Sequence, residues 1–140
     1  MGLASNSCLS QITNLKDRDM VEKTTLVNIY KKNQKLPDCA SFKTALFMEG
    51  GKIPSCFLLK KELNTLVTKR IIKIFLNNKS FQKPSPECFS TDFGMILFDS
   101  KKRIIGNIAL SSVCNNLSLN GAMPFTLTEK ANSQLLEIFQ

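Results

Sequence analysis

Asp92–Ser112, with the sequence DFGMILFDSKKRIIGNIALSS, contains two apolar runs that flank a short polar turn. The runs are Asp92–Asp99 and Arg103–Ser112, and Ser100, Lys101 and Lys102 separate them. Two apolar runs joined by a polar three-residue loop predict a β-hairpin. Because both faces of each strand are apolar, we expect the hairpin to lie in the middle of a sheet that is covered on both sides.

The expected register of this hairpin brings two cysteines together. If Asp99 lies opposite Arg103, the pairing continues outward until Cys88 lies opposite Cys114. Residues that face each other across two strands are close enough for a disulfide after a small local adjustment. We therefore predict a Cys88–Cys114 disulfide if the chain is exported, and a turn one residue longer or shorter would remove the argument.

Two further strand regions precede the hairpin. Thr24–Tyr30 is rich in β-branched residues and predicts a first strand. Phe42–Glu49 and Ile53–Leu59 flank Gly50–Gly51, which predicts a second hairpin because glycine tolerates positive φ. A phosphate-binding role for the two glycines has little support, since no Walker or dinucleotide pattern surrounds them. Pro54 lacks an N–H, so its strand should be an edge strand or begin after it.

Helical spacing appears in two places. Apolar residues between Glu62 and Asn77 recur every three or four positions and predict an amphipathic helix, with a shorter helix capped by Thr68 as the alternative. A second apolar stripe near the carboxyl end predicts a terminal helix, with Thr126 or Thr128 as its N-cap. The segment between this helix and the hairpin, Asn115–Pro124, is rich in Asn, Ser and Gly and predicts a loop.

These elements indicate an α+β fold. We expect a mainly antiparallel sheet of about five strands with two helices packed on it. Residues 1–20 are polar and without periodicity, which predicts a flexible leader, and residues 21–140 should form a single domain.

Composition excludes several classes of enzyme. The chain contains no histidine, and histidine is the usual general base near neutral pH and the commonest metal ligand. Hydrolases with Ser-His-Asp or Cys-His sites and His-ligated zinc enzymes cannot be built from this chain alone. The five cysteines are too widely spaced for a C-x-x-C motif, so no metal, cofactor or redox site is predicted. Asp92 and Asp99 are expected to form turns, because their separation along a strand exceeds that of glycosidase carboxylates.

The formal charge of +8 favours an anionic partner without identifying it. The basic residues are dispersed rather than massed in one tract, which is more typical of solvated surface than of a nucleic-acid-binding arm. The candidate basic binding surface consists of seven residues: Lys60, Lys61, Lys69, Arg70, Lys101, Lys102 and Arg103.

The segment from Cys88 to Asn115 also resembles a pattern found in small uncharacterised exported proteins and lipoproteins of Bacteroidetes. In that pattern a cysteine precedes an apolar strand that ends in an aromatic residue and Asp, and after a turn a second strand ends in Cys and Asn. Here the matching features are Cys88, the Phe98–Asp99 pair and Cys114–Asn115. The resemblance covers about half of the chain and departs from the pattern at Thr91–Phe93 and at Ser111, where the family often has Pro-Arg-His and a cysteine. It implies export to the periplasm or outer membrane, with Cys8 as a residue that could carry a lipid, and it implies no established activity.

Three hypotheses about function follow. The first is an exported, non-enzymatic module that binds a protein or envelope component, in the manner of an inhibitor or immunity protein. The second is a cytoplasmic nucleic-acid-binding domain that uses its positive charge. The third is a cysteine-dependent enzyme whose nucleophile is Cys56 or Cys114. No run of apolar residues is long enough for a transmembrane helix.

Overall fold

The computed structural model describes residues 15–33, 35, 48, 51–85, 88–122 and 124–140. Within these residues the chain forms one seven-stranded sheet in which every neighbouring pair of strands is antiparallel. The strand order is β2-β1-β4-β5-β6-β7-β3. The strands are β1 Leu26–Lys32, β2 Phe57–Leu63, β3 Phe81–Gln82, β4 Phe93–Phe98, β5 Ile104–Ser111, β6 Asn116–Leu119 and β7 Phe125–Leu127. The helices are α2 Leu15–Glu22, α4 Thr65–Leu76 and α5 Glu129–Phe139, with a short 3₁₀ helix, η1, at Asn78–Ser80.

The predicted α+β class and the antiparallel sheet are confirmed, but within the described residues the sheet has seven strands rather than five, and three α-helices are present rather than two. The additional strands are short. β6 lies inside the predicted loop Asn115–Pro124, where Asn116 and Ser118 alternate with two leucines and all four side chains are buried. Two of these four residues are polar, and for that reason the composition of the segment predicted a loop. The alternation of polar and apolar residues in the same segment is that of a strand.

The predicted central hairpin is β4 and β5, and its register shifts by one residue within the ladder. Phe98 pairs with Ile104 as the Asp99–Arg103 turn requires, but Leu97 pairs with Gly106, so Ile105 is an extra residue in β5. From this bulge onward every pair differs by one position from the predicted register. Gly94, for example, lies opposite Ala109.

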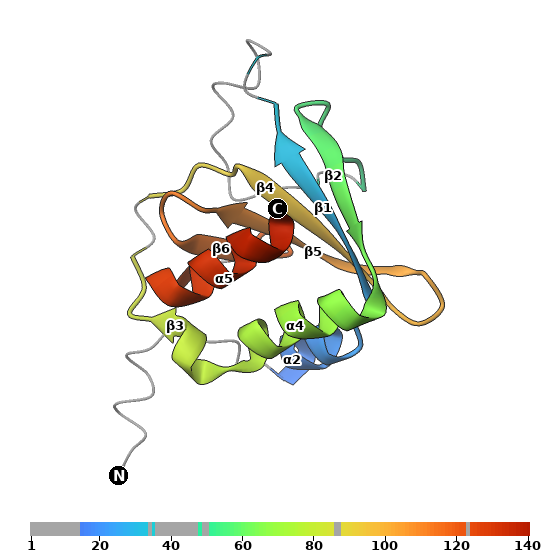
Figure 1. Ribbon diagram of the computed structural model, residues 1–140, viewed down its shortest axis with the longest axis horizontal. Helices are drawn as coiled ribbons and strands as arrows, with labels where there is room; N and C mark the ends of the chain where they lie inside the picture. The colour runs from blue at the N-terminus through green and yellow to red at the C-terminus, as the bar shows by residue number, and fades with distance from the viewer. Residues whose placement is uncertain (1–14, 34, 36–47, 49–50, 86–87, 123) are drawn as a thin grey trace.

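The helices and the sheet enclose the main core. Figure 1 shows α2, α4 and α5 together on one side of the sheet. The side chains from these helices that face the strands include Val21, Ile71, Phe75 and Leu135, each at most 1% exposed. The strands contribute buried residues at alternate positions, and this set is Val27, Ile29, Met95, Leu97, Ile108, Leu110, Leu117 and Leu119.

Helix α2 occupies the end of the segment predicted to be a flexible leader. Its residue Val21 is fully buried, and Met20 packs against the core. A methyl group added at Gly106 would lie 2.5 Å from the Met20 sulfur, so the missing side chain of Gly106 makes room for α2. The leader prediction is therefore wrong from residue 15 onward, because two apolar side chains anchor an otherwise polar helix. Residues 1–14 lie outside the described residues.

Helix α4 begins later than predicted. Strand β2 continues to Leu63, which pairs with Val27, and the helix then starts after Asn64. The Asn64 side chain accepts a hydrogen bond from the backbone N–H of Val67 at 2.9 Å and so caps the helix. Thr68, the alternative cap, is buried within the helix. The predicted stop at Asn77 and the predicted Thr128 cap of α5 are both confirmed.

On the second face of the sheet, the described residues Met48, Ile53 and Phe89, which lie outside the strands, pack against a second buried cluster. This smaller cluster consists of Cys56, Phe57, Ile96 and Ala109, and Tyr30 also packs against it. The predicted hairpin strand Phe42–Glu49 lies, apart from Met48, outside the described residues. Its predicted partner Ile53–Leu59 is shifted in the structure, because β2 begins at Phe57 after a turn closed by the Pro54 carbonyl and the Phe57 N–H.

Candidate functional site

Strand β2 forms one edge of the sheet and is the most exposed of the strands that the structure describes. It pairs with β1 on one side, and the strand order places no described strand on the other. Its five middle residues are all exposed, including Leu58 at 57% and Leu59 at 49%. Large apolar side chains on an unpaired edge are a recognised means of joining another chain.

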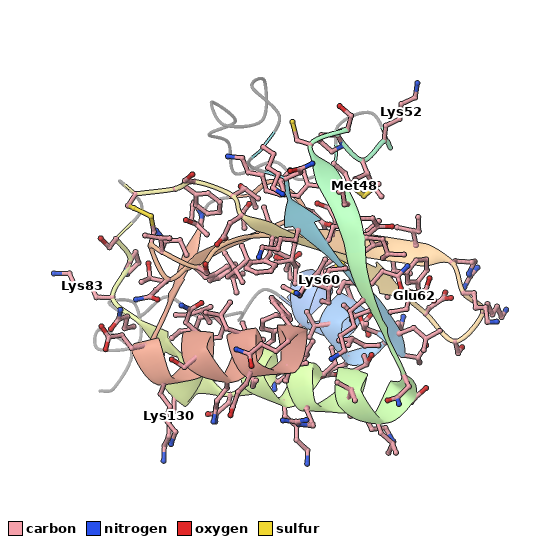
Figure 2. All side chains as sticks on the ribbon, turned by 45° about the horizontal axis from the view of Figure 1, so that its top comes forward. Met48, Lys52, Lys60, Glu62, Lys83 and Lys130 are labelled. Carbon is pink, nitrogen blue, oxygen red and sulfur yellow. A yellow bond between two sulfur atoms is a disulfide. The ribbon has the colours of Figure 1, made fainter. Side chains whose placement is uncertain are left out.

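A bulge in β2 changes which side chains face the helices. Ile29 pairs with Lys61 and Tyr30 pairs with Leu59, so Lys60 is the extra residue on β2. Figure 2 shows Lys60 and Glu62 along this outer strand.

The first half of β2 lines a basic groove of about 400 Å³. We use the term basic groove for the depression lined by Lys31, Lys32, Asn33, Lys35, Leu58, Leu59 and Lys60. None of these described lining residues is a carboxylate. Lys31, Lys35 and Lys60 are exposed, and the Lys31 ammonium lies 5.9 Å from the centre of the Phe93 ring. Lys32 is 7% exposed and has interactions of its own.

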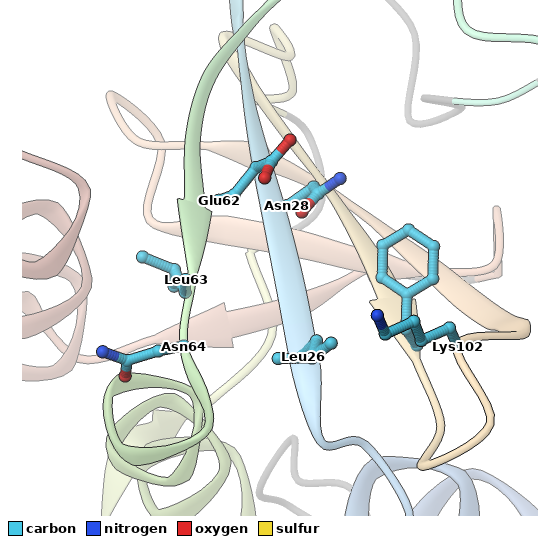
Figure 3. Close-up of a pocket in the computed structure, with 7 residues that line it drawn as sticks. Leu26, Asn28, Glu62, Leu63, Asn64 and Lys102 are labelled. Carbon is cyan, nitrogen blue, oxygen red and sulfur yellow. The ribbon is translucent and has the colours of Figure 1, made fainter.

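The second half of β2 lines a mixed groove of about 410 Å³. The mixed groove is lined by Leu26, Asn28, Glu62, Leu63, Asn64, Phe98 and Lys102. Glu62 and Asn28 are cross-strand partners, and Figure 3 shows their side chains next to each other. The described lining of this groove therefore has one carboxylate, Glu62, one ammonium, Lys102, and three apolar residues. Strands β1 and β2 both contribute to the two grooves, and because β2 is the outer strand of the pair, a ligand along its edge would contact both.

The seven residues of the predicted basic surface are distributed over three elements. Lys60 lines the basic groove, and Lys102 lines the mixed groove with Glu62. Lys69 is exposed on α4, where Arg70 and Lys73 line a separate depression with Glu137. Lys101 is exposed in the β4–β5 turn.

Among the described residues, the side chains of two of the seven have partners at hydrogen-bonding distance. The Lys61 ammonium donates hydrogen bonds to the carbonyls of Ile138 and Gln140 at the end of α5, each at 3.3 Å. Arg103 forms an ion pair with Asp99 at 2.9 Å. Sequence reasoning missed Lys31 and Lys35 as neighbours of Lys60, because the predicted first strand ends at Tyr30 whereas β1 continues and pairs Lys31 with Leu58.

The predicted Cys88–Cys114 disulfide is present, with Cα atoms 5.6 Å apart. The ladder does not create it in the way that the sequence suggested, because β4 begins at Phe93 and the bulge changes the register. The Asn116 side chain instead donates hydrogen bonds to the carbonyls of Cys88 and Ser85 at 2.7 and 2.8 Å. This amide positions the segment before β4 beside β6. Cys56 is also disulfide-bonded.

The remaining candidates for chemistry have structural roles. Cys56 and Cys114, the proposed nucleophiles, are in disulfides and so are not thiolates. Asp92 accepts hydrogen bonds from the backbone N–H and the hydroxyl of Ser112, and it closes the open end of the hairpin rather than forming a turn. Asp99 accepts hydrogen bonds in the β4–β5 turn, where the backbone N–H of Arg103 is the main cause that lowers the pKa of its carboxyl.

The described residues contain no group of three or more His, Cys, Asp or Glu side chains that could hold a metal ion. Among the helices in the described part of the chain, none has the length and apolar character needed to cross a membrane. Comparison of the chain with protein-family models, with curated proteins and with solved structures finds no match.

Proposed function

We propose that this chain is a non-enzymatic, exported interaction module that binds a protein or a component of the cell envelope through the outer edge of β2. The observation that carries the proposal is the pair of exposed leucines, Leu58 and Leu59, on an edge strand bordered by Lys31, Lys35 and Lys60. An apolar centre with a charged rim is the usual arrangement of a protein-binding surface.

Export is supported by the cysteines. Disulfides persist in oxidising compartments and are rare in the cytosol. The Cys88–Cys114 bond and the bonded state of Cys56 therefore favour a periplasmic or extracellular location. An inhibitor or immunity protein fits these features, because such a protein needs a complementary surface and no catalytic residues.

The nucleic-acid-binding alternative receives less support from the same surface. Proteins that bind single strands place exposed aromatic rings in a basic groove, so that bases can stack on them. Among the described residues the exposed large hydrophobic side chains are aliphatic: Leu58, Leu59, Leu66, Ile104 and Val113. The basic groove thus offers leucines where a stacking surface would be expected.

Site-specific photocrosslinking tests the proposal. A photoreactive amino acid at position 58 should capture a discrete partner in cells that express the chain natively. The same amino acid at position 104 is a matched control, because Ile104 is also a strand residue and is 56% exposed against 57% for Leu58. Crosslinks at both positions, or at neither, would contradict binding through β2, and recovery of nucleic acid at position 58 would favour the alternative.

A further inference from the structure

We infer that the partner adds an extended segment to the sheet along β2, antiparallel to it, with acidic side chains towards the basic groove and uncharged or basic side chains towards Glu62. This inference rests on the proposed function and specifies the chemistry of the partner. It is carried by the position of β2 at the edge of the described strands and by the distribution of charge along that edge.

The backbone of β2 provides the attachment. An edge strand offers N–H and C=O groups that point away from its one neighbour, and an extended peptide satisfies them by becoming the next strand. Every described pair of neighbouring strands in the sheet is antiparallel, so an antiparallel addition continues the existing pattern. Hydrogen bonds to the backbone supply affinity, and the side chains on either side supply specificity.

The charge of the basic groove indicates which kind of segment would bind beside β2. At the first half of β2, the exposed residues Lys31, Lys35 and Lys60 line the basic groove together with Leu58 and Leu59, and the described lining contains no carboxylate. In an antiparallel pairing of two copies centred on β2, Lys60 of one copy would lie opposite Lys60 of the other, and each copy has a net charge of +8. Like charges directly opposite in a sheet are destabilising, so these lysines oppose self-pairing and favour an acidic strand.

The order of charged residues along the partner segment follows from the position of Glu62. This carboxylate stands only two positions after Lys60 on β2, and it lines the mixed groove beside Asn28. A uniformly anionic polymer laid along the edge would meet repulsion from Glu62 there, where Lys102 is the one basic residue of the described lining against four in the basic groove. An antiparallel segment avoids it when its acidic residues are in its carboxyl-terminal half, which lies next to Leu58, and its amino-terminal half lies next to Glu62.

Short synthetic peptides test this inference directly on the intact chain. The probe is a fluorescein-labelled peptide with Val at alternate positions, Glu between them in the carboxyl-terminal half, and Thr and Lys in the amino-terminal half. Three comparison peptides carry Gln in place of Glu, the reversed order of the charged halves, or N-methyl groups that remove the N–H donors on one edge of the peptide. Fluorescence anisotropy measures their dissociation constants, and amide chemical shifts locate the site.

The expected result is that the probe binds with shifts centred on Phe57–Leu63 and that each comparison peptide binds about fivefold or more weakly. Lys60→Glu should weaken the probe by roughly tenfold, because a like charge replaces an attractive one. Lys83→Glu is the control with the same change of charge. Lys83 is exposed directly after β3, at the opposite edge of the sheet (Figure 2), and its replacement should leave binding within about twofold.

Equal binding of the probe and its N-methylated form would overturn strand addition, and equal binding of the two charge orders would overturn the antiparallel direction. Failure of every peptide, together with a discrete crosslink from position 58, would overturn this inference while leaving the proposed function in place. Loss of that crosslink as well would remove both. Tighter binding of a single-stranded oligonucleotide to the same β2 amides would replace the acidic peptide by a nucleic acid.

Discussion

The carboxylate of Asp99 accepts hydrogen bonds from both the backbone N–H and the side-chain Nε of Arg103, each at 2.9 Å. It also accepts one from the backbone N–H of Lys101 at 2.9 Å. Lys102, between Lys101 and Arg103, has a φ of 60°, a backbone conformation that residues other than glycine rarely adopt. The hydrogen bonds to the Asp99 carboxylate therefore stabilise the β4–β5 turn, including the unfavourable backbone conformation of Lys102.

The first prediction concerns pH. The pKa of Asp99 is lowered below its ordinary value of 3.8, chiefly by the Arg103 N–H. A lowered pKa in the folded state means that the stabilisation is complete above the ordinary pKa and is lost as the pH falls through the folded-state value. Asp99→Asn should therefore lower Tm at pH 7, and the difference from the wild-type chain should shrink as the pH falls below 3.8. Thermal unfolding at several pH values measures it, and a constant difference would contradict this account.

The second prediction concerns the contact between α2 and β5. Gly106→Ala places a methyl group 2.5 Å from the sulfur of Met20 and 3.2 Å from Oδ1 of Asn120. The Met20 side chain is flexible, so it should move, and we expect a loss of about 1 kcal/mol in the free energy of unfolding. In a Met20→Ala background the same substitution should cost less than half as much. A double-mutant cycle by urea denaturation gives the coupling, and additive effects would show that α2 does not require the glycine.

The third prediction concerns the disulfide. The Cys88–Cys114 bond closes a loop between residues 26 apart in the sequence. Closing a loop of this size restricts the unfolded chain, so replacement of both cysteines by serine should cost about 3 kcal/mol. Denaturation of the variant and of the wild type, with and without reductant, checks the value. Intact mass after alkylation of the natively expressed protein is the control, because a free Cys88 thiol would show that the bond does not form in its own compartment.

The fourth prediction concerns the amide that positions the disulfide. The Asn116 side chain is fully buried, donates to Ser85 and Cys88, and accepts a hydrogen bond from the Thr126 hydroxyl at 2.6 Å. Asn116→Ala leaves these groups without that partner and should cost about 2 to 3 kcal/mol. Faster hydrogen exchange in the segment that precedes β4 should accompany the loss. Asn78→Ala, at an exposed position, is the matched control and should change stability by less than about 0.5 kcal/mol.

The central strands and both longer helices could be predicted because each has a strong local signal. The Cys88–Cys114 disulfide is present, but it was predicted from a register that the bulge in β5 changes. The apolar runs of β4 and β5 define the hairpin, and the Thr128 cap begins α5 as expected. The bulge at Ile105 could not be predicted, since it depends on packing across the sheet and leaves no pattern in the sequence. Strand β6 was missed although its sequence alternates as a strand does. Its polar residue Asn116 is buried because it forms hydrogen bonds with Ser85 and Thr126, which lie in distant segments.

The candidate site shows the same division. Lysines could be listed from the sequence, but which of them share a surface depends on the order of the strands. Lys31 and Lys60 line one groove because β1 and β2 pair, whereas Arg103 is neighbour to Asp99 in a turn and Lys61 donates to the end of α5. Charge alone therefore left out Lys31 and Lys35, and binding through the seven residues of the predicted basic surface stays a prediction.

The fifth prediction separates binding from stability at β2. Leu58 and Leu59 are about half exposed or more, so replacing both with serine removes little buried apolar surface. The free energy of unfolding should change by less than about 1 kcal/mol, while crosslinking from a photoreactive residue at the neighbouring position 60 should be lost. Leu97→Ala is the contrasting variant, because this side chain is fully buried in the core and its truncation should cost about 3 kcal/mol. If the serine variant proves as unstable as Leu97→Ala, the two leucines support the fold rather than a partner. If it is stable and still crosslinks, the edge of β2 binds without them.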